Sequence, residues 1–436
     1  MSSSASFPPV RPREIFGWAM FDFANSSYTT LIVTVAFSVY FTKLVVPANQ
    51  GQADLLWSTG IAASNWLVVL LGPILGAMAD GMGRKKEFLL GTYLLCVLGT
   101  FGLYFVLPGH VAMGLALFVL SNLGFSFGEN LVASFLPEIS TPANVGRISG
   151  FGWGLGYFGG LACLMLARPL LKAGFSLENL PNIRLTWVMT AAFFLIAALP
   201  TFLFLRERAP RGPARSLGSY VQVSFERIRS TFREVRQFRD LAVFLGSFFL
   251  FYAGLSTVIS FASIYAEKTF GFQFADLLTL FVMLQLCSAA GAFAFGFIQD
   301  KIGARRTIQV GLVLWLVVTV AAATVQTRGA FWVVAVGAGL AIGSVQSAAR
   351  GMVGLFAPVS KSGEFFGFWG LAGKSSYGVG PLVFGAVSAA SGSQRVAIAS
   401  TVLFFLSGLI LLAFVDEARG QAAAAAWQEP ESASSG

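Results

Sequence analysis

Four ionisable residues stand inside long apolar stretches of this chain, namely Asp22, Glu129, Arg350 and Lys374. A charged side chain at the centre of a bilayer costs roughly 2.5 to 3.5 kcal/mol on insertion scales, so each is a functional candidate that needs a partner. A buried carboxylate can pair with a cation or carry a proton, and a fixed ammonium can bind a carboxylate. These residue types therefore suit ion pairing, proton transfer or the binding of a charged group.

Asp22 begins a polar stripe, because Asn25 and Ser26 follow at positions i+3 and i+4 of a helix and Tyr28 lies above them. One interpretation places this stripe on the wall of a substrate cavity. The other makes Asp22 a carboxylate at the membrane edge that pairs with a nearby arginine. The sequence leaves both open.

Lys374 lies about ten residues into its apolar run, too deep for its ammonium to reach the interface easily. It can bind a substrate carboxylate, with Gln346 as a nearby hydrogen-bond partner. The alternative is a structural ion pair with Glu129 or Asp22. The candidate substrate-binding residues are Lys374, Asp22, Asn25, Tyr28 and Gln346.

The elements that position these residues are membrane helices. Hydrophobic residues make up 56% of the chain and charged residues only 11%, against roughly 25% in soluble domains, and the mean hydropathy is +0.74. An ordinary water-soluble protein is excluded. Twelve apolar runs are each long enough for one crossing: 17–42, 55–79, 87–107, 111–136, 148–171, 185–205, 241–266, 274–299, 307–326, 330–355, 364–388 and 396–415.

Most lysines and arginines fall in alternate loops, which places both termini in the cytoplasm. The longest polar interruption separates six runs from six. It contains a basic amphipathic pattern that fits a connector on anionic lipid or, alternatively, a regulatory docking helix. The predicted parts are a cytosolic lead (1–16), an N-terminal six-helix half (17–205), a linker (206–240), a C-terminal six-helix half (241–415) and a disordered cytosolic tail (416–436).

One motif occurs in both halves. Residues 76–86 read GAMADGMGRKK and residues 296–306 read GFIQDKIGARR, so Gly, Asp, Gly and two basic residues recur at the same spacing. The glycines permit close helix contact, and the aspartates can accept hydrogen bonds from amides at a neighbouring helix N-terminus, while the basic cluster stays at the lipid headgroups. We expect gating residues here: Gly76, Asp80, Gly83, Arg84, Gly296, Asp300, Gly303 and Arg305.

Glu129 and Arg350 are separated by nearly the repeat distance, so they occupy equivalent positions in the two halves. We predict that they form a gating ion pair across the central axis. The alternative is that each side chain reaches the inner interface or pairs within its own half.

The chain offers little for other chemistry. Its net charge of +9 is explained by topology-setting residues, so no nucleic-acid partner is expected. Cys96, Cys163 and Cys287 lack metal-ligand spacing, and His110 is the only histidine. We therefore expect no catalytic residue, no metal and no cofactor. A phosphate-binding G-x-x-x-x-G-K-[ST] loop is missing from the sequence, which disfavours ATP-driven transport by this chain alone.

Twelve runs in a six-plus-six repeat, with G-x-x-x-D-x-x-G-R-K after the second, resemble the major facilitator superfamily. Three stretches resemble its vacuolar amino-acid effluxer-like branch. Residues 18–28 read WAMFDFANSSY, close to W-x-x-Y-D-W-A-N-S-x-Y. Residues 135–160 contain FLPE, GRISGFGW and GYFGG, and residues 343–374 contain GSVQSAAR, GEFFG and GK. Ala349 departs from the serine expected before Arg350, which argues against a hydroxyl contact to substrate there.

The resemblance implies an all-α membrane protein with twelve transmembrane helices in two pseudo-symmetric six-helix bundles. It further implies a secondary transporter that moves a small, amino-acid-like or carboxylate-bearing solute by alternating access. The other classes that we weigh are a non-transporting sensor on a transporter scaffold and a membrane-embedded enzyme. We expect a monomer in the bilayer of a bacterial inner membrane, and Asp22 and Glu129 as candidate carriers of a coupled proton.

Overall fold

The computed structural model describes residues 9–47, 52–208, 226, 229 and 236–427. All regular structure in these ranges is helical, with no strand among them. This agrees with the predicted all-α class. A backbone in lipid must satisfy its own hydrogen bonds, which a helix does within one segment.

Each predicted apolar run overlaps a helical span. Before residue 209 the helices are α1 (Pro12–Tyr28), α2 (Phe37–Tyr40), α3 (Ala53–Met82), α4 (Lys85–Gly102), α5 (Val111–Ala133), α6 (Leu136–Ile139), α7 (Val145–Leu171), α8 (Leu180–Ala197) and α9 (Leu199–Phe204). From residue 236 onward they are α11 (Arg239–Phe270), α12 (Phe274–Ile302), α13 (Ala304–Thr324), α14 (Arg328–Phe356), α15 (Ser362–Ser391), α16 (Gln394–Leu412) and α17 (Glu417–Ala426).

Within the described ranges, 11 helical spans are long and apolar enough to cross a membrane. The predicted run over 364–388 lies in α15, which is as long as these spans but is not one of them. Its many glycines and serines, together with Lys374, lower its mean hydropathy. Small residues of this kind allow close helix contact in membranes.

The first span is irregular in its second half. α1 continues into a π-helical segment, η1 (Thr29–Val35), and α2 continues into a second one, η2 (Phe41–Val45). Nearly all residues of η1 are β-branched, and such side chains fit the regular α-helix less well. Irregular helix within a membrane is tolerated where it lines a cavity, and π-helical turns are frequent at functional sites.

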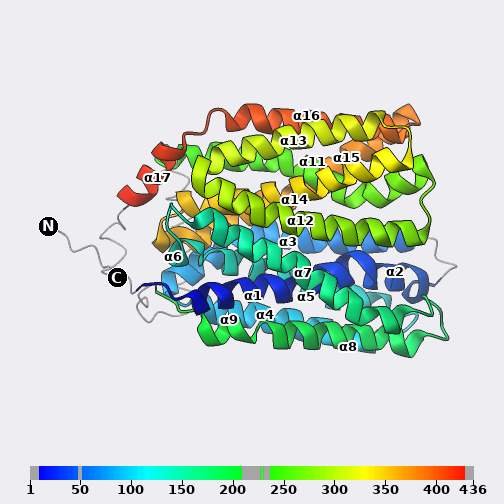
Figure 1. The fold of residues 1–436 in the computed structure, drawn as a ribbon. Coiled ribbons are helices and arrows are strands. Elements are labelled where there is room, and N and C mark those ends of the chain that lie inside the picture. The colour runs from blue at the N-terminus through cyan, green and yellow to red at the C-terminus, as the bar shows by residue number, and fades with distance from the viewer. Residues whose placement is uncertain (1–8, 48–51, 209–225, 227–228, 230–235, 428–436) are drawn as a thin grey trace.

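Figure 1 shows the long helices running side by side, with the earlier part of the chain in blue to green below and the later part in green to red above. α1 packs on α5, α7, α8 and α9, while α11 packs on α15 and α16, and α13 on α14 and α16. The early and late parts meet along two seams, one between α3 and α15 and one between α7 and α12.

The start of α1, the short helix α6 and the C-terminal helix α17 all lie at one end of the molecule (Figure 1), which we call the termini end. Residues 417–426 were predicted to belong to a disordered tail but form α17. Their alanine run has high helix propensity, and Asp416 caps the helix by accepting from the Arg419 amide at 3.0 Å. The amphipathic pattern predicted within 206–240 lies mostly outside the described residues.

Candidate functional site

A cavity of about 1090 Å³ lies between the early and late helices. It reaches from Asp22 and Arg350 to Ser38 and Ser58, which stand near the ends of the first two spans away from the termini end. The volume matches the upper range of small-molecule pockets, roughly 300 to 1,000 Å³. All four ionisable residues identified from the sequence line this cavity.

One buried ion pair closes the floor of the cavity. Arg350 of α14 donates from Nη1 to Asp22 Oδ2 of α1 at 2.6 Å, and the arginine side chain is only 3% exposed. The same guanidinium donates to the Ser149 hydroxyl at 3.1 Å and to the Ser149 carbonyl at 2.8 Å. It also lies over the rings of Trp18 and Trp153, with its centre 4.6 and 5.4 Å from their centroids. The pair thus joins α1 and α7 to α14.

Glycine at position 152 makes room for this pair. A Cβ built there would lie 2.5 Å from Asp22 Oδ2 and 2.6 Å from Arg350 Nη2. A side chain at position 152 would have to displace the pair, so the glycine-rich face of α7 is the surface on which the pair rests.

The predicted pairing of Glu129 with Arg350 is wrong in this structure. Glu129 pairs with Lys374 instead, with 3.7 Å between the carboxylate oxygen and the ammonium nitrogen. The repeat spacing related these two residues across the two halves, and the structure shows both in the cavity lining. The spacing could not give the direction of each side chain around its helix, and Ser149 and Asp22 hold Arg350 toward α7 and α1.

The Glu129–Lys374 pair is the more accessible of the two. Its side chains are 25% and 17% exposed, whereas those of Asp22 and Arg350 are 12% and 3% exposed. Lys374 also lies 5.2 Å from the centroid of the Phe125 ring. The contact to Glu129 is longer than an optimal charged hydrogen bond of about 2.8 Å. A ligand can therefore enter between these two charges more readily than between the other two.

The remaining predicted binding residues divide into two groups. Asn25 and Gln346 line the cavity. Tyr28 does not, and its prediction as a binding residue is wrong, because its side chain is fully buried. Its hydroxyl lies 2.8 Å from the Ser121 hydroxyl, and its ring stacks on Phe125. Tyr28 lies six residues after Asp22 in the regular helix α1, about 240° around its axis, so it faces away from the side that carries Asp22.

Two tyrosines of the cavity were not identified from the sequence. Tyr157 of α7 donates its hydroxyl proton to the Gln346 amide oxygen, and the amide nitrogen of Gln346 donates to the Tyr252 hydroxyl at 3.2 Å. Gln346 therefore links α7 to α11 across the floor. Tyr157 stood within the quoted GYFGG stretch, but its aromatic character alone fits packing as well as a site.

Below the floor, the termini end is closed by the repeated motif. Asp80 accepts hydrogen bonds from the amides of Gly363 and Glu364, at 3.0 and 2.9 Å. Asp300 accepts from those of Gly146 and Arg147, at 2.7 and 3.3 Å. These amides belong to the first turns of α15 and α7, which confirms the prediction that both aspartates bind a helix N-terminus.

The motif glycines let the helices touch along both seams. A Cβ at Gly76 would overlap the Gly363 carbonyl oxygen, and one at Gly296 would lie 2.8 Å from that of Gly146. Gly83 and Gly303 have φ of 58° and 88°, which other residues rarely adopt. The motif therefore requires glycine for two different reasons. Gly76 and Gly296 allow close helix contact, and Gly83 and Gly303 adopt a positive φ.

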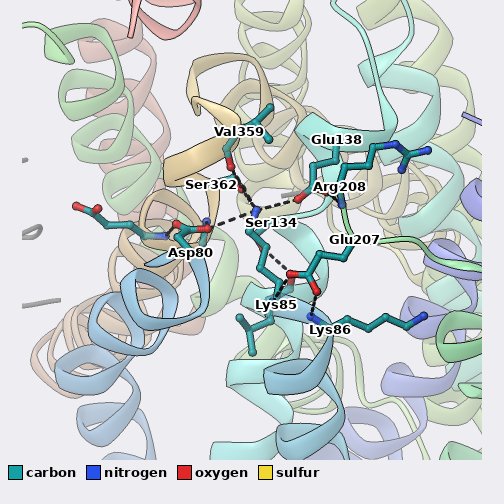
Figure 2. A network of polar contacts seen from close by, with 12 residues as sticks. Asp80, Lys85, Lys86, Ser134, Glu138, Glu207, Arg208, Val359 and Ser362 are labelled. Atoms are coloured by element: carbon teal, nitrogen blue, oxygen red, sulfur yellow. Dashed lines mark hydrogen bonds and ion pairs between the residues drawn. The ribbon is translucent and has the colours of Figure 1, made fainter. Parts of the chain in front are cut away.

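Lys85 is the charged centre of the closed end (Figure 2). Its ammonium is fully buried, lies 2.9 Å from Glu138 and 3.4 Å from Asp80, and donates to the Ser362 hydroxyl. The sequence placed the basic cluster at the lipid headgroups, which is wrong for Lys85. Arg84, predicted as a gating residue, is half exposed and pairs with Glu87 instead. Gly83 adopts the left-handed conformation at the end of α3 and turns the chain. As a result Lys85, and not Arg84, enters the seam.

A family model described as "Vacuole effluxer Atg22 like" matches residues 140–425, which is most of the chain. The chain belongs to the Atg22-like family. It is 28% identical to an uncharacterized MFS-type transporter, YxiO, of Bacillus subtilis, over 92% of this chain and 94% of that protein. Autophagy-related protein 22 of Coccidioides immitis is 23% identical over 80% of this chain and 70% of its own length. The resemblance seen in the sequence is thereby confirmed.

Solved structures show the same fold. The human organic anion transporter MFSD10 gives a TM-score of 0.73 at 16% identity, covering 92% of this Atg22-like chain and all of its own. FucP in the outward conformation gives 0.70 at 14% identity, covering 92% of this chain and 98% of its own. YxiO is named as an MFS-type transporter, FucP as a transporter of the major facilitator superfamily and MFSD10 as an organic anion transporter.

The Atg22-like chain also repeats a capping device that the sequence analysis missed. Glu207, after α9, accepts hydrogen bonds from the amides of Lys85 and Lys86 at the start of α4. Glu417, after α16, accepts from those of Ala304 and Arg305 at the start of α13. Each carboxylate is stabilised at its helix N-terminus, because the positive end of the helix dipole attracts negative charge.

Burial affects one of these carboxylates. Loss of hydration raises the pKa of Glu207 above its ordinary value, and the two backbone amides act in the opposite direction.

A basic residue follows each of the two glutamates and forms an ion pair. Its partner is an acidic residue of the first long helix in that part of the chain, α1 in the early part and α11 in the late part. Arg208 lies 2.7 Å from Glu14, and Arg419 lies 2.6 Å from Asp240.

Removing the Glu417 carboxylate is expected to destabilise the protein. The Glu417→Ala variant leaves two amides of α13 without their cap, a loss of about 0.5 to 2 kcal/mol. Its apparent melting temperature in detergent should fall below that of Glu178→Ala, which alters an exposed glutamate between α7 and α8. Equal melting temperatures for the two variants would contradict a capping role.

Proposed function

We propose that this protein is a secondary transporter that moves a small solute by alternating access. The observation that carries the proposal is the central cavity, which ends on two ion pairs and lies above a closed seam region. Two six-helix bundles, with α15 as the twelfth membrane helix, would rock about this site. The packing of α1 with α5, α7, α8 and α9, and of α11 with α15 and α16, supports this division.

The cavity points away from the termini end, and the distribution of lysine and arginine favours cytoplasmic termini. We therefore assign this structure to an outward-facing state, in keeping with its likeness to FucP in the outward conformation. Asp80, Asp300 and Lys85, with the glycines beside them, would form the cytoplasmic gate. The membrane would be a bacterial plasma membrane, as the relative from Bacillus subtilis suggests, and the transporter would act as a monomer.

The charges of the floor favour a zwitterionic solute. Asp22, Arg350, Glu129 and Lys374 sum to zero, so the empty site has no excess charge to neutralise. An amino-acid-like solute can place its carboxylate on Lys374 and its ammonium on Glu129, which replaces one ion pair by two. A simple carboxylate would leave an unbalanced negative charge in a region of low dielectric constant. Its binding would require a proton on Glu129, and this supplies a route to proton coupling.

The Lys374→Gln variant is expected to weaken zwitterion binding by about 1.5 to 3 kcal/mol, the contribution of a charged hydrogen bond. Binding of amino acids can be screened by thermal shift, because a ligand that binds only the folded state stabilises it. Uncharged analogues should bind the wild type and Lys374→Gln with equal affinity. The matched control is Lys43→Gln, which alters an exposed lysine outside the cavity. Equal losses for charged and uncharged ligands would make Lys374 purely structural.

Transport separates the competing functions. Purified protein in sealed proteoliposomes should move the solute that binds, and an imposed pH gradient should accelerate uptake if Glu129 carries a proton. Binding without movement would favour a sensor on a transporter scaffold. Chemical conversion of the solute would favour an enzyme.

A further inference from the structure

We propose that the cavity opens sideways to the bilayer between α3 and α15, and that this opening receives the apolar chain of an amphipathic ligand. The zwitterionic head of that ligand would bind at Glu129 and Lys374. The binding of the zwitterionic head rests on the proposed function. The new part is a site for the apolar tail of the ligand. It follows from the shape of the α3–α15 seam, from the exposure of its residues and from the position of Lys374.

α3 and α15 touch at glycines near the termini end. A Cβ at Gly367 would lie 2.7 Å from Pro73 Cα and 2.9 Å from the Gly72 carbonyl oxygen, so the two helices touch there. Gly378 lies about 16 Å farther along α15, at a helical rise of 1.5 Å per residue. A Cβ at Gly378 has no neighbouring atom within 4 Å, although this residue lines the cavity. The two helices have separated at this level.

Glycines also line the α7–α12 seam. Four glycines of α7 would each bring a Cβ to within 3.4 Å of an atom of α12, namely Gly146, Gly150, Gly154 and Gly160. These positions span about 21 Å of the helix. At these four glycines α7 and α12 do not stand apart as α3 and α15 do at Gly378.

The residues beside the opening face both the cavity and the outside of the molecule. Trp66 of α3 is 63% exposed and Leu382 of α15 is 74% exposed, and both line the cavity. On the α12 side, Leu280 lines the cavity but is only 2% exposed. Exposed apolar side chains within the span of a membrane helix contact lipid. The cavity wall is thus continuous with the lipid-facing surface at the α3–α15 seam.

Lys374 connects the opening to the ionic floor. It stands four residues before Gly378 on α15, so the two share one helical face. A ligand whose carboxylate binds Lys374 has its chain directed past Gly378, among the apolar side chains of Ile61, Trp66 and Leu382. Each methylene that leaves water there should tighten binding about fourfold.

The test uses 2-aminobutanoic, 2-aminooctanoic and 2-aminododecanoic acids, which share one head and differ in chain length. Their binding to the full chain in lipid nanodiscs is compared for Gly378→Trp and for Gly385→Trp. Both glycines are exposed, and a Cβ added at either would meet no atom within 4 Å, but only Gly378 lines the cavity. The indole introduced by Gly378→Trp should fill the opening.

We expect wild type and the Gly385→Trp variant to bind the longest acid at least tenfold more tightly than the shortest. Gly378→Trp should bind the shortest acid within about threefold of wild type and lose most of the gain with chain length. Leu382→Ser, paired with Leu203→Ser at a similarly exposed leucine of α9, supplies a second comparison if the tryptophan disturbs folding. Leu382→Ser, but not Leu203→Ser, should reduce the gain in affinity with chain length.

The same chain-length dependence in Gly378→Trp and Gly385→Trp, with the short acid still bound, would overturn the lateral opening and leave the head-group site intact. No binding of any of the three acids to wild type would overturn both the lateral opening and the zwitterion site.

Discussion

Replacing Lys85 with methionine is expected to abolish transport while leaving ligand affinity nearly unchanged. The variant leaves the Glu138 carboxylate without its buried cation and removes one of the charges beside Asp80. Breaking a buried ion pair by removing one partner costs about 3 to 5 kcal/mol. The Lys85 ammonium also donates to the Ser362 hydroxyl and the Val359 carbonyl, which belong to the later part of the chain, so the share of the loss at these contacts falls on the closed state. A shift of about 3 kcal/mol changes the ratio of the two states by more than a hundredfold.

Opening of the termini end can be followed with a cysteine at Ser134, which is buried beside the network (Figure 2), in a chain without Cys96, Cys163 and Cys287. The thiol should react with a water-soluble maleimide far faster in Lys85→Met than in wild type. Lys86→Met is the control, because the Lys86 ammonium lies outside the network and donates to the Leu205 carbonyl at 2.6 Å.

Neutralising Glu138 as well should recover part of the transport lost in Lys85→Met. The double variant Lys85→Met with Glu138→Gln no longer buries an unpaired carboxylate at this contact, and neutral groups of similar size often replace a buried ion pair at little cost. Unchanged maleimide labelling in Lys85→Met, with normal transport, would remove Lys85 from the gate.

The second large effect is expected at the floor of the cavity. Arg350→Gln leaves Asp22 as a buried carboxylate without a cation, and Asp22→Asn leaves the guanidinium with only Ser149 and two aromatic rings. Each single variant should lose stability by about 3 to 5 kcal/mol and should transport poorly. The double variant should be less damaged than the sum of the two, which thermal unfolding and uptake measure together.

The same measurement decides between the two pairings of Arg350. A double-mutant cycle between Asp22 and Arg350 should give a coupling energy well above about 0.5 kcal/mol, the usual error of additivity for separate sites. A cycle between Glu129 and Arg350 should be nearly additive, because Glu129 pairs with Lys374. The opposite result would restore the pairing predicted from the repeat.

Hydropathy was sufficient to predict the long helices, because a lipid environment permits few backbone solutions. The run at 55–79 became α3 (Ala53–Met82), and the run at 330–355 became α14 (Arg328–Phe356). The duplicated motif also predicted the binding of Asp80 and Asp300 to helix N-termini. Fixed spacing places a carboxylate at the same level of a helix in both halves, and helix ends offer unpaired amides.

The sequence could not decide which charges meet. Spacing along a helix gives depth and singled out Glu129, Arg350, Asp22 and Lys374, and the structure shows all four in the lining of one cavity. Pairing depends on the direction of each side chain and on neighbours from distant segments. Ser149 and Gly152 of α7 orient Arg350 toward Asp22, and Gly83 turns Lys85 into the seam in place of Arg84. Such contacts between helices arise only when the chain has folded, because no local pattern encodes the rotation of one helix against another.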